Sequence, residues 1–481
     1  MEVVSKQKQI AVIRNIKTND LNMYQKFGGL IFCILLLFIT QIVSGQSQTL
    51  SIKEVLQKVQ TNLPQLEALR QQAIAAEQNI ALAKNTIVPD LNAGYQVNMA
   101  TFNNITGMSY PGFLLPISGP PSINNTMNFV PGSALGALVK WNPFTFGQRD
   151  AAIERASAQF KQANAAYNEQ LFQFEYNAVN IYLEVVYCEQ VLKSLQANID
   201  RSKVSLEQVL VLAKNGLRPG IDTTQFQAAI VQAEMDYLQT ERTCQQKITE
   251  LTRLTGDKEP IENIVLTDTL FNQQLVTLID TASSINQHPY YQNIEAQKQV
   301  TEAGLKEIQK SLAPQLDIWG NVYARGSGVD ASGNVDKIQG VGLSRTNLGV
   351  GIQLSFPILK YKRVNIEKKQ YQSLLQSDNA RLAQAQLDIS KQIETAVMQY
   401  QQDVKIADKS PELLKAANNV YEGLRLSYET GLIDFTRLAN AQYELQKAEV
   451  NNANARLQLW RSLLAIAVAK GNLNLFTEQL K

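Results

Sequence analysis

Few residues in this sequence are of the types that carry out chemistry. His288 is the only histidine, which removes His-based catalytic triads and His-cluster metal sites. The sequence also lacks a phosphate-binding glycine loop and a nucleophile motif. We therefore expect no catalytic residue, no metal site and no bound cofactor, and an enzyme is the least favoured function class. Because His288 precedes Pro289 at the expected start of a helix, a structural role is favoured for it.

Cysteines are the other reactive candidates. Cys33 lies in an apolar N-terminal run, and Cys188 and Cys244 lie in the rest of the chain. Two thiols in a chain of this length do not make a disulfide framework. Cys188 falls in a helical apolar stripe and is expected to pack in the interior. Cys244 lies at a similar distance from the predicted turn at 214–221, so a bridge between the two is geometrically conceivable.

Charge and hydropathy limit the function classes further. The 481 residues include 45 Lys and Arg and 43 Asp and Glu, a balance that disfavours nucleic-acid binding. The mean hydropathy is −0.17, which disfavours a bundle of transmembrane helices. We expect no nucleic-acid partner.

The N-terminus resembles an export signal. Residues 27–45 form an apolar run that follows Lys26 and ends in small residues. This pattern predicts a secretory signal peptide over 1–45, and an N-terminal membrane anchor is the alternative. Translation could start at Met1 or Met23. Cys33 follows a phenylalanine, where lipoprotein cleavage requires a small residue, so we expect no lipid anchor.

The elements that must position any site occur twice in the sequence. Residues 88–97 match 313–322, and Gly216 and Gly256 recur 215 residues later as Gly431 and Gly471. Each copy is predicted to contain a helix, a strand, a loop, a strand, a very long helix, a tight turn and a helix. We expect residues 46–63, the inter-repeat segment and the tail to form a small side domain. The predicted divisions are a signal peptide at 1–45, repeat 1 at 46–256, an inter-repeat equatorial segment at 257–288, repeat 2 at 289–471 and a C-terminal tail at 472–481.

Two pairs of strands alternate in a way that suits lipid on one face and water on the other. Leu91, Ala93 and Tyr95 alternate with Asn92 and Gly94, and the same pattern recurs near residue 350. A half-buried soluble sheet is the alternative. The aromatic residues expected in a membrane-interface belt are Trp141, Phe144, Phe146, Trp319 and Tyr323. The predicted strands cover about 90–99, 135–146, 315–325 and 347–357.

Four strands cannot close a transmembrane barrel, because the smallest such barrels have about eight. Open sheet edges are also too costly in lipid. The pattern therefore predicts a barrel shared by a homotrimer, with twelve strands and outer-membrane lipid around it. Stretches 100–134 and 324–346 suit loops on the outer surface.

Two helices are too long for a globular domain. Residues of about 148–214 contain neither proline nor internal glycine, which predicts a helix on the order of 100 Å long. Its apolar stripe indicates antiparallel coiled-coil packing. The matching helix covers about 362–428, and we expect Pro411 to kink or break it. A coiled-coil scaffold without a channel is the alternative interpretation.

The duplicated order, the strand pairs, the long helices and the glycine turns together resemble the TolC family of outer-membrane efflux proteins, over essentially the whole mature chain. The resemblance implies a mainly α fold with membrane β: a trimeric 12-stranded outer-membrane β-barrel, four strands per chain, continued by a periplasmic α-helical coiled-coil barrel. It also implies localisation in the cell outer membrane. The implied function is the passive exit duct of a tripartite efflux pump for small molecules. The implied partners are a periplasmic adaptor and an inner-membrane transporter of RND or ABC type.

The resemblance also implies a role for the two glycine turns. Members of the family present such turns at the periplasmic tip, where the adaptor makes contact. The matching residues are Gly216, Leu217, Gly431 and Leu432. Glycine after a helix also serves as an ordinary C-cap, and both roles are compatible.

Polar residues beyond these turns narrow the entrance in the family. Asp222 falls at one acidic position, whereas the corresponding residues of the second copy are Arg437 and Asn440, a departure from an acidic ring. Asp434 lies nearby and would supply three carboxylates in a trimer. Asp222 and Gln225 also fit a capping box, which is the simpler role for Asp222. We hypothesise that Arg437 pairs with an acidic neighbour and helps to hold the entrance closed.

Two other functions remain open from the sequence. One is the exit duct of a type I protein secretion system. The other, from a different class, is a periplasmic adaptor or coiled-coil interaction protein. Adaptors also carry long helical hairpins but lack duplicated pairs of lipid-type strands.

Overall fold

The computed structural model describes residues 48–101, 103, 125, 127–257, 264–265, 285–330, 332 and 334–480. The chain divides into two compact units. In the smaller unit, strand β1 (Gln48–Thr49) pairs in parallel with β4 (Ile264–Val265). The predicted signal peptide and most of the inter-repeat segment lie outside the described residues, so those two predictions stay untested.

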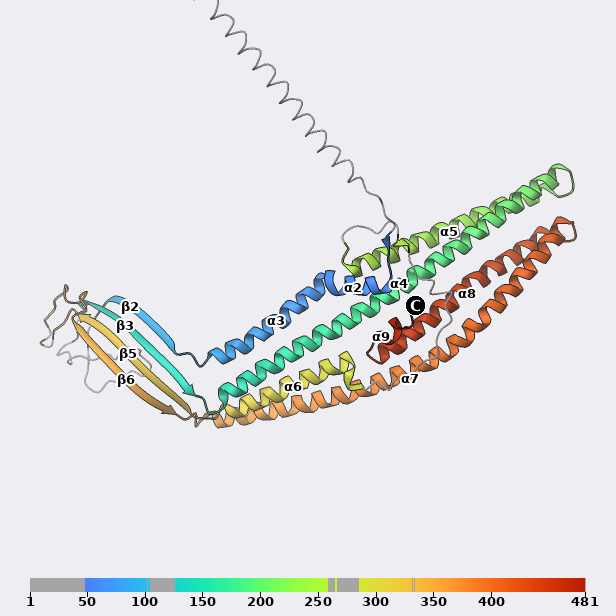
Figure 1. Cartoon of the computed structure of the whole chain (residues 1–481). Helices are drawn as coiled ribbons and strands as arrows, with labels where there is room; N and C mark the ends of the chain where they lie inside the picture. Colours follow the sequence, from blue (N-terminus) through green and yellow to red (C-terminus); the bar gives the residue numbers. More distant parts are fainter. Residues whose placement is uncertain are drawn as a thin grey trace, which may run out of the picture. The chain divides into compact units, whose positions relative to one another are not determined.

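The larger unit is mostly helical and contains two copies of one helix–strand–strand–helix–helix series (Figure 1). Helices α4 and α5 lie side by side as one antiparallel hairpin, and α7 and α8 form a second. The short helix α2 packs against α4 and α5. The helices of this unit are α2 (Ile52–Asn62), α3 (Pro64–Asn85), α4 (Gln148–Lys214), α5 (Gly220–Thr255), the 3₁₀ turn η2 (Ile285–Gln287), α6 (Pro289–Lys310), α7 (Lys360–Glu429), α8 (Phe435–Ala469) and α9 (Asn474–Thr477).

Glycines at the helix ends mark the duplication in the backbone. Gly256 after α5 and Gly471 after α8 both have φ of +70°, a left-handed conformation that disfavours other residues. A Cβ on Gly256 would lie 2.7 Å from the Asn62 carbonyl oxygen, and one on Gly471 would lie 2.8 Å from Cα of His288. Each glycine thus lets a hairpin end close against the start of the proline-initiated helix in its own repeat.

His288 has the structural role that was expected. It is the N-cap of α6, where its Nδ1 accepts a hydrogen bond from the Tyr290 backbone N–H at 3.2 Å. Its Nε2 lies 3.2 Å from the Val468 carbonyl oxygen, a geometry that fits the neutral Nε2–H tautomer. Burial lowers the pKa of His288.

Helix α7 runs continuously from Lys360 to Glu429 with Pro411 inside it. Of the two predicted effects of this proline, a kink or a break, the break was wrong. A proline leaves the carbonyl four residues earlier without its N–H donor, here that of Ala407. The Ser410 hydroxyl lies 3.1 Å from this oxygen and donates to it. The same hydroxyl lies 2.9 Å from Oδ1 of Asn452 in α8. The neighbouring serine therefore compensates for the missing backbone bond.

The strands form a four-stranded antiparallel sheet in the order β2-β3-β5-β6, as far as the described residues extend. This confirms the predicted fold class of a mainly helical chain with four strands in two repeats. A register shift between Trp141 and Phe144 interrupts the pairing of β3 with β5. The strands are β2 (Asp90–Thr101), β3 (Phe129–Phe144), β5 (Gln315–Ser327) and β6 (Arg345–Ser355).

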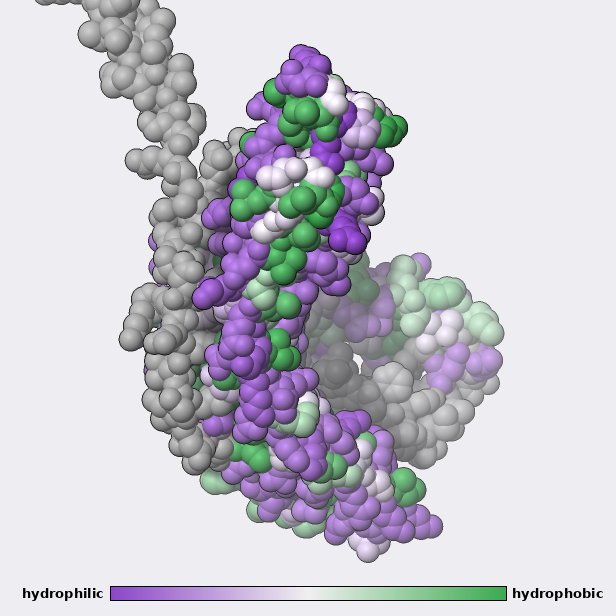
Figure 2. All heavy atoms as spheres, turned by 90° about the vertical axis from the view of Figure 1, so that its right-hand side faces the viewer, coloured by the Kyte–Doolittle hydropathy of each residue, from purple (hydrophilic) through white to green (hydrophobic). Residues whose placement is uncertain are grey.

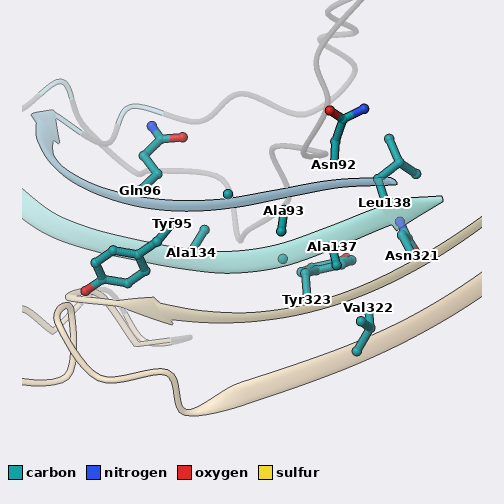
Figure 3. A pocket seen from close by; sticks show the side chains of 12 residues that line it. Asn92, Ala93, Tyr95, Gln96, Ala134, Ala137, Leu138, Asn321, Val322 and Tyr323 are labelled. Atoms are coloured by element: carbon teal, nitrogen blue, oxygen red, sulfur yellow. The ribbon is translucent and has the colours of Figure 1, made fainter. Parts of the chain in front are cut away.

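The register puts the alternating aliphatic residues of β2 and β6, and most of those of β3 and β5, on one face. Leu91 pairs with Val139, which pairs with Gly320 and, through it, with Val350. Paired residues share a face, so the alternation found in single strands becomes one continuous apolar surface. In Figure 3, Asn92 projects to one side of β2 and Tyr95 to the other.

The same register corrects part of the expected aromatic belt. Trp319 pairs with Lys140 and Gly351, and Tyr323 pairs with Gly136, so both aromatics lie on the polar face. Trp319 covers Gly351, where an added Cβ would lie 2.6 Å from the indole ring. Successive residues of a strand point to opposite faces, so an assignment that is off by one residue places a side chain on the wrong face of the sheet. This is why the two aromatics do not belong to the expected belt.

No helix among the described residues combines the length and the apolar character needed to cross a membrane.

Candidate functional site at the hairpin tips

The two hairpins end in turns of the same construction. Gly216 and Gly431 have φ of +69° and +83°. The N–H of Leu217 bonds to the carbonyl of the residue five before it at 2.9 Å, and that of Leu432 does the same at 2.9 Å. These are the bonds of a helix C-cap with left-handed glycine, so the capping role holds in both copies.

The turns present exposed leucines. Leu217 is 70% exposed and Leu432 is 78% exposed. Figure 2 faces this end of the hairpins, where hydrophobic residues form patches among hydrophilic ones. An apolar side chain this exposed contributes little to packing within the chain, so it is available for contact with another protein.

A buried hydrogen bond joins the two hairpins just behind the turns. The Tyr428 hydroxyl near the end of α7 donates to Oδ2 of Asp222 in α5 at 2.8 Å. Tyr428 is 3% exposed and Asp222 is 8% exposed. Burial and the Asp222 hydrogen bond both raise the pKa of Tyr428, while the nearby Arg218 opposes the rise. The hydroxyl therefore stays protonated and remains a donor at neutral pH.

Arg218, in the first turn, adds a second link to the same tyrosine. Its guanidinium carbon lies 4.2 Å from the centre of the Tyr428 ring, a cation–π arrangement. One guanidinium nitrogen also donates to the Tyr428 carbonyl oxygen. Phe226 packs edge-on against Tyr428 and Phe435, with ring centres 5.9 Å and 4.5 Å apart. The tips of the two repeats are thus held together by one apolar and polar cluster.

Asp222 is not the helix cap that the sequence suggested. The N-cap of α5 is Pro219, and among the described residues no side chain caps this end. Because α5 begins at Gly220, Asp222 lies inside the first turn, where its charge is favourable at the positive helix end. Its carboxylate turns toward Tyr428 instead of back toward the backbone.

The second-copy candidates lie in a different place. Asp434 is the N-cap of α8 and accepts a hydrogen bond from the Arg437 backbone N–H at 3.1 Å. The Arg437 side chain is exposed and makes no ion pair with another described residue of the chain. Arg437 and Asn440 line a groove of about 760 Å³ between α7 and α8. The structure therefore brings these two together in one groove, whose lining does not include Asp222.

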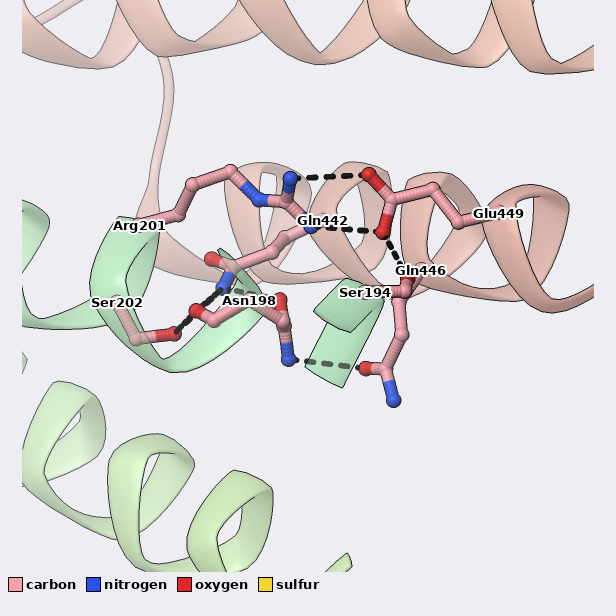
Figure 4. A network of polar contacts seen from close by, with 7 residues as sticks. All are labelled: Ser194, Asn198, Arg201, Ser202, Gln442, Gln446 and Glu449. Atoms are coloured by element: carbon pink, nitrogen blue, oxygen red, sulfur yellow. Dashed lines mark hydrogen bonds and ion pairs between the residues drawn. The ribbon is translucent and has the colours of Figure 1, made fainter. Parts of the chain in front are cut away.

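A polar network ties α4 to α8 farther from the tips (Figure 4). Arg201 in α4 forms a two-pronged ion pair with Glu449 in α8 at 3.0 Å and 3.1 Å. The Ser194 hydroxyl donates to the same carboxylate. Below them, the amide of Gln442 reaches Oδ1 of Asn198 at 2.9 Å. The contact between α4 of the first repeat and α8 of the second is therefore made in part by hydrogen bonds and an ion pair.

Sequence reasoning missed Tyr428 and Arg218. Their signal was weak: an aromatic residue three before one turn glycine and a cation two after the other. Within the described residues, no group of three or more His, Cys, Asp or Glu side chains could hold a metal ion. The geometry is that of a latch between two hairpins, made of hydrogen bonds and ring contacts.

Comparisons with known proteins agree on the architecture. The chain is similar to CusC at 13% identity and a TM-score of 0.72, over 88% of this chain and 92% of CusC. The CmeC outer membrane channel of Campylobacter jejuni gives 13% identity and a TM-score of 0.70, over 89% and 90%. The MtrE outer membrane channel of Neisseria gonorrhoeae gives 15% and 0.69, over 88% and 89%. At these identities the likeness establishes the fold.

The search of curated proteins found no match to this chain. A family model does match it over residues 55–257 and 282–472, which together are most of the chain. That family is described as the outer membrane efflux protein family. This chain therefore belongs to the outer membrane efflux protein family and is an outer-membrane protein.

Proposed function

We propose that three copies of this chain form one channel that serves as the passive exit duct of a tripartite efflux pump. The channel would carry small molecules across the outer membrane, supplied by an inner-membrane transporter of RND or ABC type through a periplasmic adaptor. Family membership supports the efflux role. The observation that carries the trimer is the four-stranded sheet with two free edges.

Those edges support an assembly of several chains. Among the described residues, β2 and β6 each pair with one neighbour, so both present unpaired backbone groups. Much of the adjoining apolar face is exposed in one chain: Leu91 is 66% exposed, Leu348 is 81% and Val350 is 82%. Unpaired backbone groups cost several kcal/mol each in lipid. Pairing β2 of one copy with β6 of the next removes every edge and yields twelve strands from three chains.

Paired substitutions on neighbouring residues of β6 test the lipid face. Leu348→Arg places a charge on the apolar face, where it costs about 2–4 kcal/mol near the bilayer centre. Asn347→Arg places the same charge on the polar face and is the control. We expect heat-modifiable trimers in purified outer membranes for the wild type and Asn347→Arg, with a marked loss for Leu348→Arg. A water-soluble monomer that tolerates both substitutions equally would contradict the proposal.

We also propose that the hairpin tips form the periplasmic entrance. The Tyr428–Asp222 bond and the Arg218 contacts hold the α7–α8 hairpin against the α4–α5 hairpin in a closed arrangement. Separation of the tips would break these contacts and widen the entrance. Asp434, Arg437 and Asn440 are exposed near the second tip. In a trimer they would surround the axis three times, and an acidic partner for Arg437 would then come from a neighbouring copy.

The exposed turn leucines are the proposed adaptor contact, together with Gly216 and Gly431, whose added Cβ atoms would have no described atom within 4 Å. A photo-crosslinking amino acid at Leu217 in living cells should trap a periplasmic protein with a long helical hairpin, identified by mass spectrometry. The same probe at the exposed Leu82 of α3, away from the tips, is the control. Identical products from both positions would refute tip-specific contact.

A further inference from the structure

Cys188 and Cys244 form an isolated thiol pair that the proposed channel does not use. Cys188 lies on α4 and Cys244 on α5, and their side chains are 6% and 3% exposed. Both are free thiols. The two thiols hydrogen-bond to each other across the hairpin. The pair therefore lies inside the contact between two antiparallel helices, with each thiol within hydrogen-bonding reach of the other.

Ion pairs on either side fix the two helices in this register. Lys247, one turn beyond Cys244, lies 2.7 Å from Glu184, one turn before Cys188. Nearer the tip, Lys203 of α4 lies 3.4 Å from Glu234 of α5. Glu184 is also held by Arg461 of α8. Because these ion pairs lie on both sides of the thiols, they resist sliding of α4 along α5. The two cysteines therefore stay opposite each other.

The pair is chemically asymmetric. The hydrogen bond from Cys244 is the largest influence on Cys188 and lowers the pKa of the Cys188 thiol. The same bond, followed by burial, raises the pKa of the Cys244 thiol. Within the packed hairpin each thiol thus changes the acidity of the other, and the thiolate is the attacking form in disulfide exchange.

We propose that Cys188 and Cys244 become a disulfide in the exported chain, which staples α4 to α5. Opposed, level sulfur atoms on adjacent helices need little backbone movement to reach bonding distance. The compartment favours oxidation, because disulfides form and persist outside the cytoplasm. The proposal rests on the outer-membrane location of the family and is independent of the trimer and the entrance.

The oxidant would be a protein disulfide of the periplasm. The Cys188 thiolate attacks one sulfur of that disulfide, forms a mixed disulfide and releases the other sulfur as a thiolate. The Cys244 thiolate then attacks the Cys188 sulfur and displaces the second donor sulfur. The two protons lost by the cysteines pass to the two released donor sulfurs, so the donor is reduced by two electrons. Because both thiols are buried in the closed hairpin, the donor reaches Cys188 while α4 and α5 are locally separated, and their return to the packed register brings the Cys244 thiol to the mixed disulfide.

The staple would distinguish the two repeats. The positions 215 residues later are Asp403 in α7 and Leu459 in α8, which cannot form the bond. The first hairpin would be covalently fixed, while the second would be held by noncovalent contacts alone. Relative movement within a repeat would then be confined to α7 and α8.

Sequential thiol labelling of the native protein tests the proposal. Outer membranes are denatured without reductant in the presence of N-ethylmaleimide, then reduced and treated with a polyethylene glycol maleimide. We expect the wild-type mature chain to gain two polymer additions after reduction. Mass spectrometry of an unreduced digest should contain one species joining the Cys188 and Cys244 peptides, lighter than their sum by two hydrogen atoms.

Single variants provide the control. In Cys188→Ala and in Cys244→Ala the remaining thiol has no partner, so N-ethylmaleimide should block it and no polymer should be added. The proposal is overturned if the wild-type thiols are already blocked before reduction, because that result means both were reduced in the cell. It is also overturned if polymer addition is unchanged in the single variants.

Discussion

Removal of the Tyr428 hydroxyl should weaken the contact between the two hairpin tips. Tyr428→Phe keeps the ring that packs against Phe226 and beneath Arg218, and deletes only the donor to Asp222. The acceptor is a carboxylate that is 8% exposed, so water replaces the lost donor poorly while the tips stay closed. The substitution therefore raises the free energy of the closed arrangement more than that of the open one.

The expected magnitude follows from the geometry. A hydrogen bond to a charged acceptor contributes about 1.5–3 kcal/mol. This corresponds to a shift of about 10- to 150-fold in the ratio of closed to open tips for each chain. Solvent screening removes little of it, because both partners are buried. Three copies in a trimer would add their contributions if the tips open together.

Planar-bilayer recordings measure this shift directly. Trimers of Tyr428→Phe should have a higher conductance or a larger open fraction than the wild type. Tyr400→Phe is the matched control: Tyr400 is also a buried tyrosine of α7, 7% exposed, but it lies outside the cluster at the tips. It should leave the entrance closed. Wild-type conductance and open fraction in Tyr428→Phe, or equal effects of the two substitutions, would refute the latch.

Three further predictions concern other positions. Arg437→Ala should raise the conductance of trimers, and wild-type conductance and voltage behaviour would exclude a gating role for this residue. Because burial lowers the pKa of His288, the unfolded chain takes up the proton first, at about pH 6.5. Stability should therefore be complete above that pH and fall as the pH drops toward the folded pKa; His288→Asn should flatten the dependence of melting temperature on pH. Ser410→Ala should destabilise α7 by about 1 kcal/mol, because it leaves a carbonyl beside the proline unpaired. Ser373→Ala, at an exposed position of the same helix without a proline, is its control in thermal unfolding.

Features that depend on neighbours in sequence could be predicted. The left-handed glycines of both turns follow from a helix that must stop, since glycine adopts that conformation without strain. The face of each strand follows from alternation, because successive side chains point to opposite sides. The position of α4, at Gln148–Lys214, follows from a long stretch without proline.

Features that join distant segments could not be predicted. Asp222 looked like a cap because its local sequence fits one. Its actual partner, Tyr428, is 206 residues away, and no local pattern connects the two.

The sequence by itself determined the duplication, the element order and the glycine turns, and it led to the proposal that the barrel takes strands from other chains. Each of these follows from local propensity or from counting, because four strands cannot satisfy their own edges in lipid. Tertiary structure decided which polar groups meet. A buried hydrogen bond forms only when both partners lose water together, and that depends on how the two hairpins pack. The link from Tyr428 to Asp222 and the facing thiols of Cys188 and Cys244 are of this second kind.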